Sequence, residues 1–289
     1  MKKDEALKKY LDENSLKNED NILVLFKLTL MEDQRVDCNN PFSRGVVKSL
    51  IDSIFYSDGW INSNGKSDPT PDYYNPSRKM MMEVMTISHY QYEKNGNKYD
   101  PDFKGVAKCI EELYSTDSEL CKRFFELNNV VKAINENDPD RIHSYQQYLD
   151  SFRRVVGHHI DEIKTYRRNH PGYKLVFLIN DESTPYYIVN EKKVGDTRIY
   201  QPIYDESFNS IIRNADIDYV IWLTPYRITP DGNYPAQIFV CDPHCLMETA
   251  SYSSEDLIPL EPADGKPTLP MFIWWTDDEK GLHRNIMWG

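Results

Sequence analysis

The sequence predicts an α/β domain whose mixed central sheet is flanked by helices. Helically spaced apolar residues mark one long helix over residues 143–168. After it the apolar period changes, and β-branched and aromatic runs at 173–181, 218–226 and 236–242 predict strands. With strands near 72–75 and at 78–87, the elements follow the order helices, strands, long helices, strands, which is typical of α/β and α+β domains.

The N-terminal half is predicted to be mainly helical. Residues 4–13 predict a short helix, whereas the apolar run 22–32 fits either a strand or a buried helix. A helix is predicted over 42–56. Pro41 marks its start, because proline is favoured at the beginning of helices. Helical spacing at 101–135 predicts a further helical region before the long helix.

The long helix is predicted to end at the segment 169–172, Asn-His-Pro-Gly, because proline and glycine terminate helices. Beyond it, a strand is expected at 186–190 and a short helix at 206–215. A last strand is expected at 271–275, in a C-terminal region rich in proline and tryptophan.

Size and composition predict a soluble protein without a membrane span. The chain has 289 residues, and we expect one domain over 1–289, with a helical extension at about 1–38 and a strand-and-loop extension at about 245–289. No apolar run reaches the roughly 18 residues of a membrane span, and the charged N-terminus lacks the apolar stretch of a signal peptide. Five cysteines, an odd number, are typical of reduced thiols. These features predict a cytoplasmic protein.

Charge and motifs restrict the classes of function. The formal net charge of -12 argues against tight nonspecific binding to nucleic acid. The segment 141–174 is nevertheless basic, with seven basic and three acidic residues, so it forms either a solvated helix face or a contact for phosphates. The sequence contains neither a Gly-x-x-x-x-Gly-Lys loop nor a Gly-x-Gly-x-x-Gly turn, the two motifs that bind nucleotide phosphates, so no nucleotide cofactor is expected. The candidate nucleic-acid contacts are Arg153, Arg154, Arg167 and Arg168.

One carboxylate interrupts a strand that is otherwise apolar. Glu83 lies in the middle of the run 80–87, and a charge inside a core costs several kcal/mol unless it is paired, neutralised or bound to a metal. Asp72, eleven residues earlier, is the candidate partner, although by itself it fits a turn as well. The alternatives are a strand face exposed to solvent and a structural ion pair, for which the sequence offers Arg78, Arg153 and Lys164.

The order of elements around these two acids resembles the PD-(D/E)xK nuclease superfamily and its restriction-endonuclease-like fold. A helix precedes a strand entered through Pro71 and Asp72, the next strand carries Glu83, and helices and a buried strand follow. The resemblance implies that Asp72 and Glu83 hold one or two Mg²⁺ or Mn²⁺ ions, which activate water to cleave phosphodiester bonds in DNA or RNA. Hard Mg²⁺ takes oxygen ligands and leaves room for water and phosphate. Asp52, on the preceding helix, is a third candidate ligand.

The sequence departs from this family at the motif lysine, because Met85 stands two residues after Glu83. Lys79, on the same strand face by parity, and Lys164, on the basic helix, are candidates for a displaced catalytic lysine. Two functions therefore remain open. One is a metal-dependent nuclease, and the other is a catalytically inactive α/β protein of the same fold that binds a partner.

Two further groups of potential metal ligands lie outside that motif. On a helix, His158 and Glu162 are four residues apart and His159 and Glu162 are three apart, so one turn offers imidazole and carboxylate together. A surface or structural role is the other interpretation of these histidines. An alternative zinc site would use Cys241, His244 and Cys245.

Overall fold

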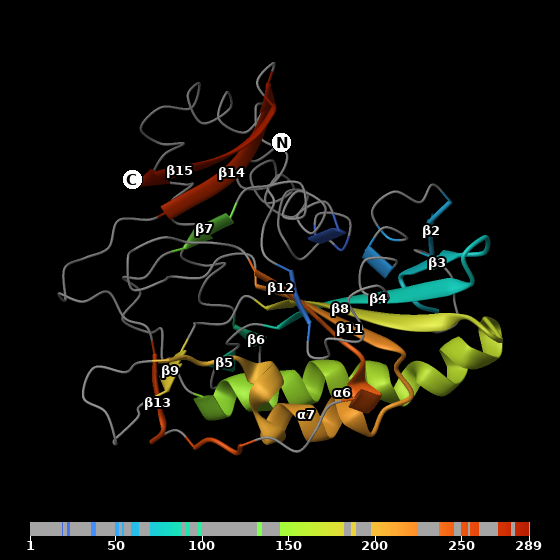
Figure 1. Cartoon of the computed structure of the whole chain (residues 1–289), viewed down its shortest axis with the longest axis horizontal. Coiled ribbons are helices and arrows are strands. Elements are labelled where there is room, and N and C mark those ends of the chain that lie inside the picture. Colours follow the sequence, from blue (N-terminus) through green and yellow to red (C-terminus); the bar gives the residue numbers. More distant parts are fainter. Residues whose placement is uncertain are drawn as a thin grey trace. The chain divides into compact units, whose positions relative to one another are not determined.

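Contacts divide the chain into two compact units, and each is described by itself. The sheet unit comprises Gln34–Ser88 and Ser144–Leu260, and the second unit comprises Met1–Asp33, His89–His143 and Glu261–Gly289. Among the helices described, none is long and apolar enough to cross a membrane. The computed structural model (Figure 1) describes residues 19, 22–23, 36–38, 50–51, 54, 59–63, 70–87, 91–92, 98–99, 132–134, 145–181, 186–188, 198–224, 237–245, 250–253, 255–259, 271–278 and 281–288.

A seven-stranded mixed sheet forms the framework of the sheet unit, which confirms the predicted α/β class. Its strand order is β1-β12-β11-β8-β4-β3-β2. The central strands β4, β8 and β11 run parallel, while β3 pairs antiparallel with β4 and with β2, and β12 pairs antiparallel with β11 and parallel with β1. The strands are β1 Val36–Cys38, β2 Ile61–Asn62, β3 Tyr73–Asn75, β4 Met80–Ile87, β8 Lys174–Asp181, β11 Tyr219–Thr224 and β12 Gln237–Cys241.

The turn between β3 and β4 sets where β4 begins. The Asn75 side-chain oxygen accepts hydrogen bonds from the Ser77 hydroxyl at 2.7 Å and from the Arg78 N–H at 3.1 Å, as asparagine does in turns. Lys79 ends the turn with φ of 51°, in the left-handed region. β4 therefore starts at Met80, slightly later than the sequence pattern predicts.

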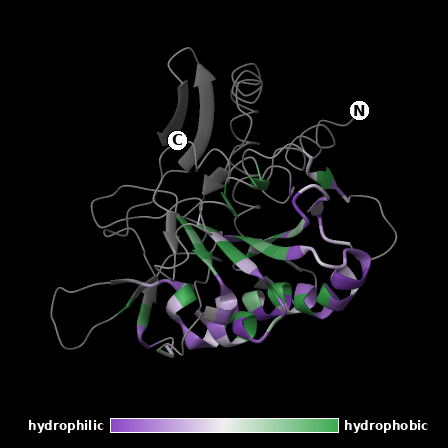
Figure 2. Ribbon diagram, turned by 45° about the vertical axis from the view of Figure 1, so that its right-hand side comes forward, coloured by the Kyte–Doolittle hydropathy of each residue, from purple (hydrophilic) through white to green (hydrophobic). Residues whose placement is uncertain are grey.

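Two helices, α6 (Tyr145–Asn169) and α7 (Glu206–Arg213), cover one face of this sheet (Figure 1). Alternate strand residues such as Met81 and Phe177 point toward them and form one buried cluster with Phe208 of α7. Figure 2 shows hydrophobic residues through the strands and mixed polarity around α6, as expected for a helix with one face on a core. Because the central strands are buried on both faces, a charge in them needs a local partner.

One arginine fastens the end of α6 to the sheet. The Arg167 guanidinium donates to the Tyr173 carbonyl at 2.6 Å, and it pairs with Asp216 and Asp218 at 3.1 and 2.8 Å. Gly172, with φ of 77°, lies in the turn between α6 and β8, where a left-handed backbone favours glycine. The helix therefore ends where the sequence predicts, and Arg167 fixes its position relative to β8 and β11.

Smaller elements complete the two units. In the sheet unit, β9, β10 and β13 form a separate antiparallel sheet. Two short 3₁₀ helices lie next to α7: η2 (Pro202–Tyr204) directly precedes it in the chain, and η3 (Pro243–Cys245) packs near it in space. In the second unit, β7, β14 and β15 form one antiparallel sheet, and β5 pairs with β6. The bounds are β5 Gln91–Tyr92, β6 Lys98–Tyr99, β7 Lys132–Ile134, β9 Tyr186–Ile188, β10 Arg198–Ile199, β13 Leu257–Pro259, β14 Met271–Asp278 and β15 Gly281–Trp288.

Two segments differ from the sequence predictions. Residues 132–134, inside the predicted helical region 101–135, form strand β7, which pairs with β14. Residues 36–38, inside the predicted helical extension, form strand β1 of the central sheet, which pairs with β12. Local patterns predict such short strands poorly, because the pairing partner lies far along the chain and supplies the stability.

The remaining predicted helices are described only in part. Residues 22 and 23 of the apolar run are helical, which favours the buried-helix interpretation at those two positions. Residues 50, 51 and 54 of the predicted helix 42–56 are helical as well. The predicted helix 4–13 lies outside the described residues.

Two buried aspartates are satisfied by aromatic donors between α6 and the sheet. Asp181, at the end of β8, accepts hydrogen bonds from the Tyr148 hydroxyl at 2.5 Å and from the Trp222 indole N–H at 2.8 Å. Both donors are almost fully buried, as is Asp181 itself. The arrangement links α6, β8 and β11 through one carboxylate.

Asp205 plays the same part at the start of α7. Its side chain caps the helix by accepting from the Ser207 N–H at 2.8 Å, and it also accepts from the hydroxyls of Tyr145 and Tyr200 at 2.5 and 2.6 Å. Burial, followed by the hydrogen bond to Asp205, raises the pKa of Tyr145 to about 12. Burial is also the main cause that raises the pKa of Tyr200. Both phenols therefore remain neutral donors well above neutral pH.

Replacing Asp181 by alanine is expected to lower the free energy of unfolding by about 2–5 kcal/mol, because it leaves two buried donors, on Tyr148 and Trp222, without this acceptor. Urea denaturation measures the change. Tyr148→Phe removes one of the two bonds and should cost about 1 kcal/mol. Asp150→Ala is the control, because Asp150 is exposed on α6, the helix that carries Tyr148; it should change the free energy of unfolding by less than about 0.5 kcal/mol. An Asp181→Ala variant as stable as the control would contradict the assignment.

Stability is expected to fall as pH rises from about 10 to about 12, because Tyr145 keeps its proton in the folded protein over a range in which the unfolded chain loses it. The contribution is fully present below pH about 10 and is lost as pH passes the folded pKa of about 12. In Tyr145→Phe the slope of unfolding free energy against pH should lessen by up to about 1.4 kcal/mol per pH unit. An unchanged slope in that variant would show that Tyr145 is not the group responsible.

Candidate metal centre

Glu83 lies on β4 at the centre of the sheet, opposite Phe177 of β8 in the parallel register. Strand alternation places it on the face toward α6, between the buried side chains of Met81 and Met85. Only 3% of Glu83 is exposed to solvent. A carboxylate in such surroundings is stable only beside hydrogen-bond donors or a cation.

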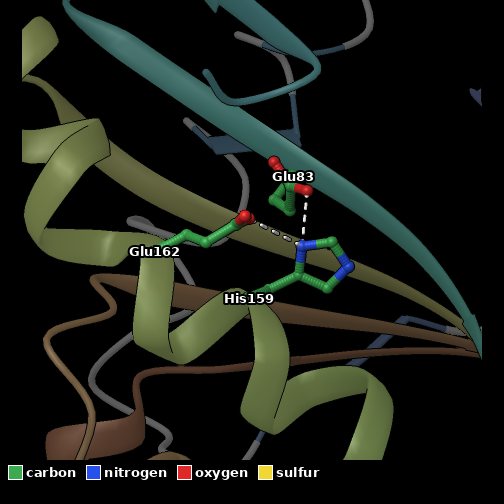
Figure 3. A group of neighbouring side chains, drawn as sticks. All are labelled: Glu83, His159 and Glu162. Carbon is green, nitrogen blue, oxygen red and sulfur yellow. Dashed lines mark ion pairs between the residues drawn. The ribbon is translucent and has the colours of Figure 1, made fainter. Parts of the chain in front are cut away.

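Helix α6 brings two side chains to this carboxylate (Figure 3). The His159 Nδ1 atom lies 2.7 Å from Glu83 Oε1, and Glu162 Oε2 lies 3.7 Å from the same nitrogen. The side chains of His159 and Glu162 are 21% and 26% exposed, so the group is partly open to solvent. Ligand atoms of all three residues lie within 4.8 Å of one another, which is compact enough to hold a metal ion.

Tyr166 supports Glu162 from the next turn of α6. Its hydroxyl donates to Glu162 Oε2 at 2.6 Å. Burial raises the pKa of Tyr166 well above its usual range, and the negative charge of Glu83, the bond and charge of Glu162, and the charge of Asp72 raise it further. The phenol therefore stays neutral and remains a hydrogen-bond donor to the carboxylate.

Asp72 lies beside Glu83, just before β3. Its N–H donates to Glu83 Oε2 at 3.2 Å, and its own Oδ2 accepts from the Val84 N–H at 2.7 Å. These reciprocal bonds fix the two acids across the antiparallel pair of β3 and β4. Asp72 is not one of the residues whose ligand atoms lie within 4.8 Å of one another, so the geometry favours a bracing role for it.

The structure places the two candidate lysines away from this group. Lys79 is exposed in the turn before β4, and its positive φ breaks the strand alternation that parity assumes. Lys164 is exposed on α6, about 200° around the helix from Glu162 at roughly 100° per residue. Met85, at the motif position of the lysine, is buried in the core. Asp52, the third predicted metal ligand, lies outside the described residues.

The four candidate arginines have different surroundings. Arg153, Arg154 and Arg168 are exposed on α6, and the Arg153 guanidinium lies 3.7 Å from the Asp150 carboxylate. They stay candidates for phosphate contacts. Arg167 is engaged with Tyr173 and two aspartates at the end of the helix, so its position is explained by a structural role.

The alternative zinc cluster is not assembled by the residues whose side chains are described. Cys241 is buried at the end of β12, whereas His244 is exposed in η3. The His244 N–H donates to the Asp242 side chain at 3.0 Å, as is common for aspartate in turns. The Cys245 side chain lies outside the described residues.

The sequence predicted the two halves of this centre separately. Glu83 was indicated by its position in an apolar strand, and the His159–Glu162 pair by its spacing of three on a helix. Their meeting depends on how α6 lies across β4, which the sequence pattern does not specify. Tyr166, four residues after Glu162, could have been found from the same helical spacing.

Comparison of the chain with protein-family models, curated proteins and solved structures finds no match.

A transition-metal ion that binds this centre is expected to raise the unfolding temperature, because it binds the folded state in preference to the unfolded chain. At a metal concentration of 100 times the Kd, the free energy of unfolding should rise by about 2.7 kcal/mol. Glu83→Gln should abolish the metal-induced rise. Asp72→Asn keeps an acceptor for the Val84 N–H and should retain the rise. Differential scanning fluorimetry with and without Mn²⁺ measures both. Loss of the rise in Asp72→Asn but not in Glu83→Gln would contradict the ligand assignment.

Proposed function

We propose that the protein is a divalent-metal-dependent hydrolase of phosphodiester bonds in nucleic acid. The observation that carries the proposal is the convergence of Glu83, His159 and Glu162, which gathers three metal-ligand atoms between the mixed sheet and α6. Two carboxylates next to an imidazole suit a divalent cation, and a bound cation activates water and stabilises charge on phosphate oxygens.

The chain order supports the resemblance to the PD-(D/E)xK superfamily. Helical residues at 50, 51 and 54 precede a strand entered through Asp72; the antiparallel partner strand carries Glu83, and α6 then leads into β8, which runs parallel to β4. The two acids of the motif are hydrogen-bonded across the strand pair. A restriction-endonuclease-like fold is therefore part of the proposal.

The residues of the centre have distinct parts in this proposal. Glu83, His159 and Glu162 hold the ion, and its chemistry is to lower the pKa of a bound water and to polarise a phosphate. Asp72 orients Glu83 through its N–H, and Tyr166 orients Glu162 through its hydroxyl. Exposed Arg153, Arg154 and Arg168 are the candidate contacts for the nucleic-acid backbone.

A second candidate is a catalytically inactive binding protein of the same fold. The observation that favours it is Met85, which fills the motif position of the lysine with a buried apolar side chain. The two displaced candidates, Lys79 and Lys164, are exposed away from Glu83. In this alternative the centre would stabilise the domain without cleaving a substrate.

Incubation of the protein with single- and double-stranded DNA and RNA, in Mg²⁺ and in Mn²⁺, tests the proposal. We expect metal-dependent cleavage of at least one of these substrates. Glu162→Gln should reduce cleavage by at least about 100-fold, because it removes a ligand of the ion. Asp161→Asn, which changes an exposed acid next to it on α6, is the matched control and should leave the rate unchanged.

Two outcomes count against this function. Equal cleavage by the parent protein and Glu162→Gln would indicate a contaminating nuclease or a different site. Absence of cleavage of all four substrates in either metal, together with salt-dependent binding of one of them, would support the inactive binding protein instead.

A further inference from the structure

We infer that the centre takes a single transition-metal ion, of the Mn²⁺, Fe²⁺ or Zn²⁺ class in preference to Mg²⁺, with His159 Nδ1 as a direct ligand. The inference rests on the metal centre of the proposed function but does not depend on the substrate. It departs from the magnesium site that the resemblance implies, in which carboxylates alone bind the ion.

The first argument is the contact between Glu83 and His159. An ionised carboxylate oxygen and an unprotonated imidazole nitrogen both present lone pairs, so the 2.7 Å contact needs a proton or a metal ion between the two atoms. Either Nδ1 carries a hydrogen that it donates to Glu83, or both atoms bind one metal ion. Glu162 adds a second carboxylate, 3.7 Å from the same nitrogen, which completes a ligand set suited to a divalent ion.

The second argument is the spacing of the ligand atoms. Two atoms that each lie about 2.1 Å from one ion are roughly 3.0 Å apart at an octahedral angle and roughly 3.4 Å apart at a tetrahedral angle. The observed separations of 2.7 and 3.7 Å lie on either side of these values. The Glu83 and Glu162 ligand atoms lie within 4.8 Å of each other, so side-chain shifts on the order of 1 Å would bring all three atoms to one ion.

The third argument is the chemistry of the donor set. Mg²⁺ demands near-octahedral oxygen coordination and gives up its water reluctantly, whereas imidazole suits iron, zinc and related ions. Glu83 is buried, so an ion held by its Oε1 must lose part of its hydration. One nitrogen and two carboxylates, one of them buried, thus favour a transition metal.

The number of ions follows from the surrounding acids. Two-metal sites place their ions about 3.5–4 Å apart and need carboxylates that reach both. Glu83 Oε2 accepts a hydrogen bond from the Asp72 N–H, and Asp72 Oδ2 accepts one from the Val84 N–H. These bonds occupy acceptor positions that a second ion would use, so among the described residues the set fits one ion.

The test is direct binding to the full-length protein, independent of any cleavage. Isothermal titration with Mn²⁺, Zn²⁺, Mg²⁺ and Ca²⁺ should give one site, with Mn²⁺ and Zn²⁺ bound at least about tenfold more tightly than Mg²⁺. Electron spin echo spectroscopy of the Mn²⁺ complex should show coupling to the ¹⁴N nucleus of a bound imidazole. That coupling distinguishes a direct nitrogen ligand from an imidazole that only contacts Glu83.

The matched variants are His159→Gln and His158→Gln. His158 is the neighbouring imidazole, 68% exposed and 3.7 Å from Glu162, but it is not part of the three-residue group. His159→Gln should weaken Mn²⁺ binding by roughly 100-fold or more and remove the ¹⁴N coupling, since the loss of an outer-shell partner alone costs 10–100-fold. His158→Gln should retain both.

Each outcome bears separately on the site and on its proposed activity. Mg²⁺ bound as tightly as Mn²⁺, no ion bound at all, or ¹⁴N coupling that persists in His159→Gln would each overturn the inference. Mn²⁺ binding with the expected coupling but without cleavage of nucleic acid would support it while the proposed nuclease activity failed. Cleavage in Mg²⁺ that is unchanged by His159→Gln would preserve the activity and overturn the nitrogen ligand.

Discussion

The contact between Glu83 and the side chains of α6 is the interaction on which the account of this molecule depends. Glu83 occupies a strand buried on both faces, where an uncompensated charge costs several kcal/mol. Two groups approach the carboxylate: the Asp72 N–H, which donates a hydrogen bond from the adjoining strand segment, and the His159 Nδ1 atom of the helix, which lies 2.7 Å away. A structural ion pair and a metal site would use the same atoms of Glu83 and His159. The two interpretations differ in whether these atoms bind a metal ion.

The position of α6 determines whether this contact forms. Near its start, Tyr145 and Tyr148 bond to the buried carboxylates Asp205 and Asp181, and near its end Arg167 binds the aspartates before β11. His159 and Glu162 lie between these anchors and are therefore presented to β4 by a helix held at both ends. The aromatic core between helix and sheet, including Phe152 stacked on Trp222 at 5.4 Å, fixes the rotation of α6.

The sequence predicted the elements better than their contacts. The spacing of apolar residues predicted α6, β4, β8 and β11, because each of these elements is long and its pattern can be read within the element itself. Glu83 could be singled out in the same way, because it is a charged residue within the apolar pattern of β4. Which helix residue meets Glu83 depends on side-chain packing between elements far apart in the chain, and periodicity does not resolve that to one residue.

Two assignments show why residue roles are harder to predict than elements. The parity argument for Lys79 assumed a continuous strand, but the turn with its left-handed residue ends that alternation. The charge pattern of α6 grouped Arg167 with the exposed arginines, whereas its guanidinium binds two aspartates that directly precede β11. Charge counts along a helix do not distinguish a solvent-facing arginine from one that fastens the helix to the sheet.

The most direct test of the central claim is the position of a metal ion relative to Glu83. Crystals soaked in Mn²⁺ and measured at the manganese absorption edge locate the ion without reference to activity. We predict one anomalous peak within about 2.3 Å of both Glu83 Oε1 and His159 Nδ1, with Glu162 as the third protein ligand. A peak on exposed carboxylates alone, or an unaltered 2.7 Å contact between Glu83 and His159 with no peak beside it, would contradict the account and leave a structural ion pair.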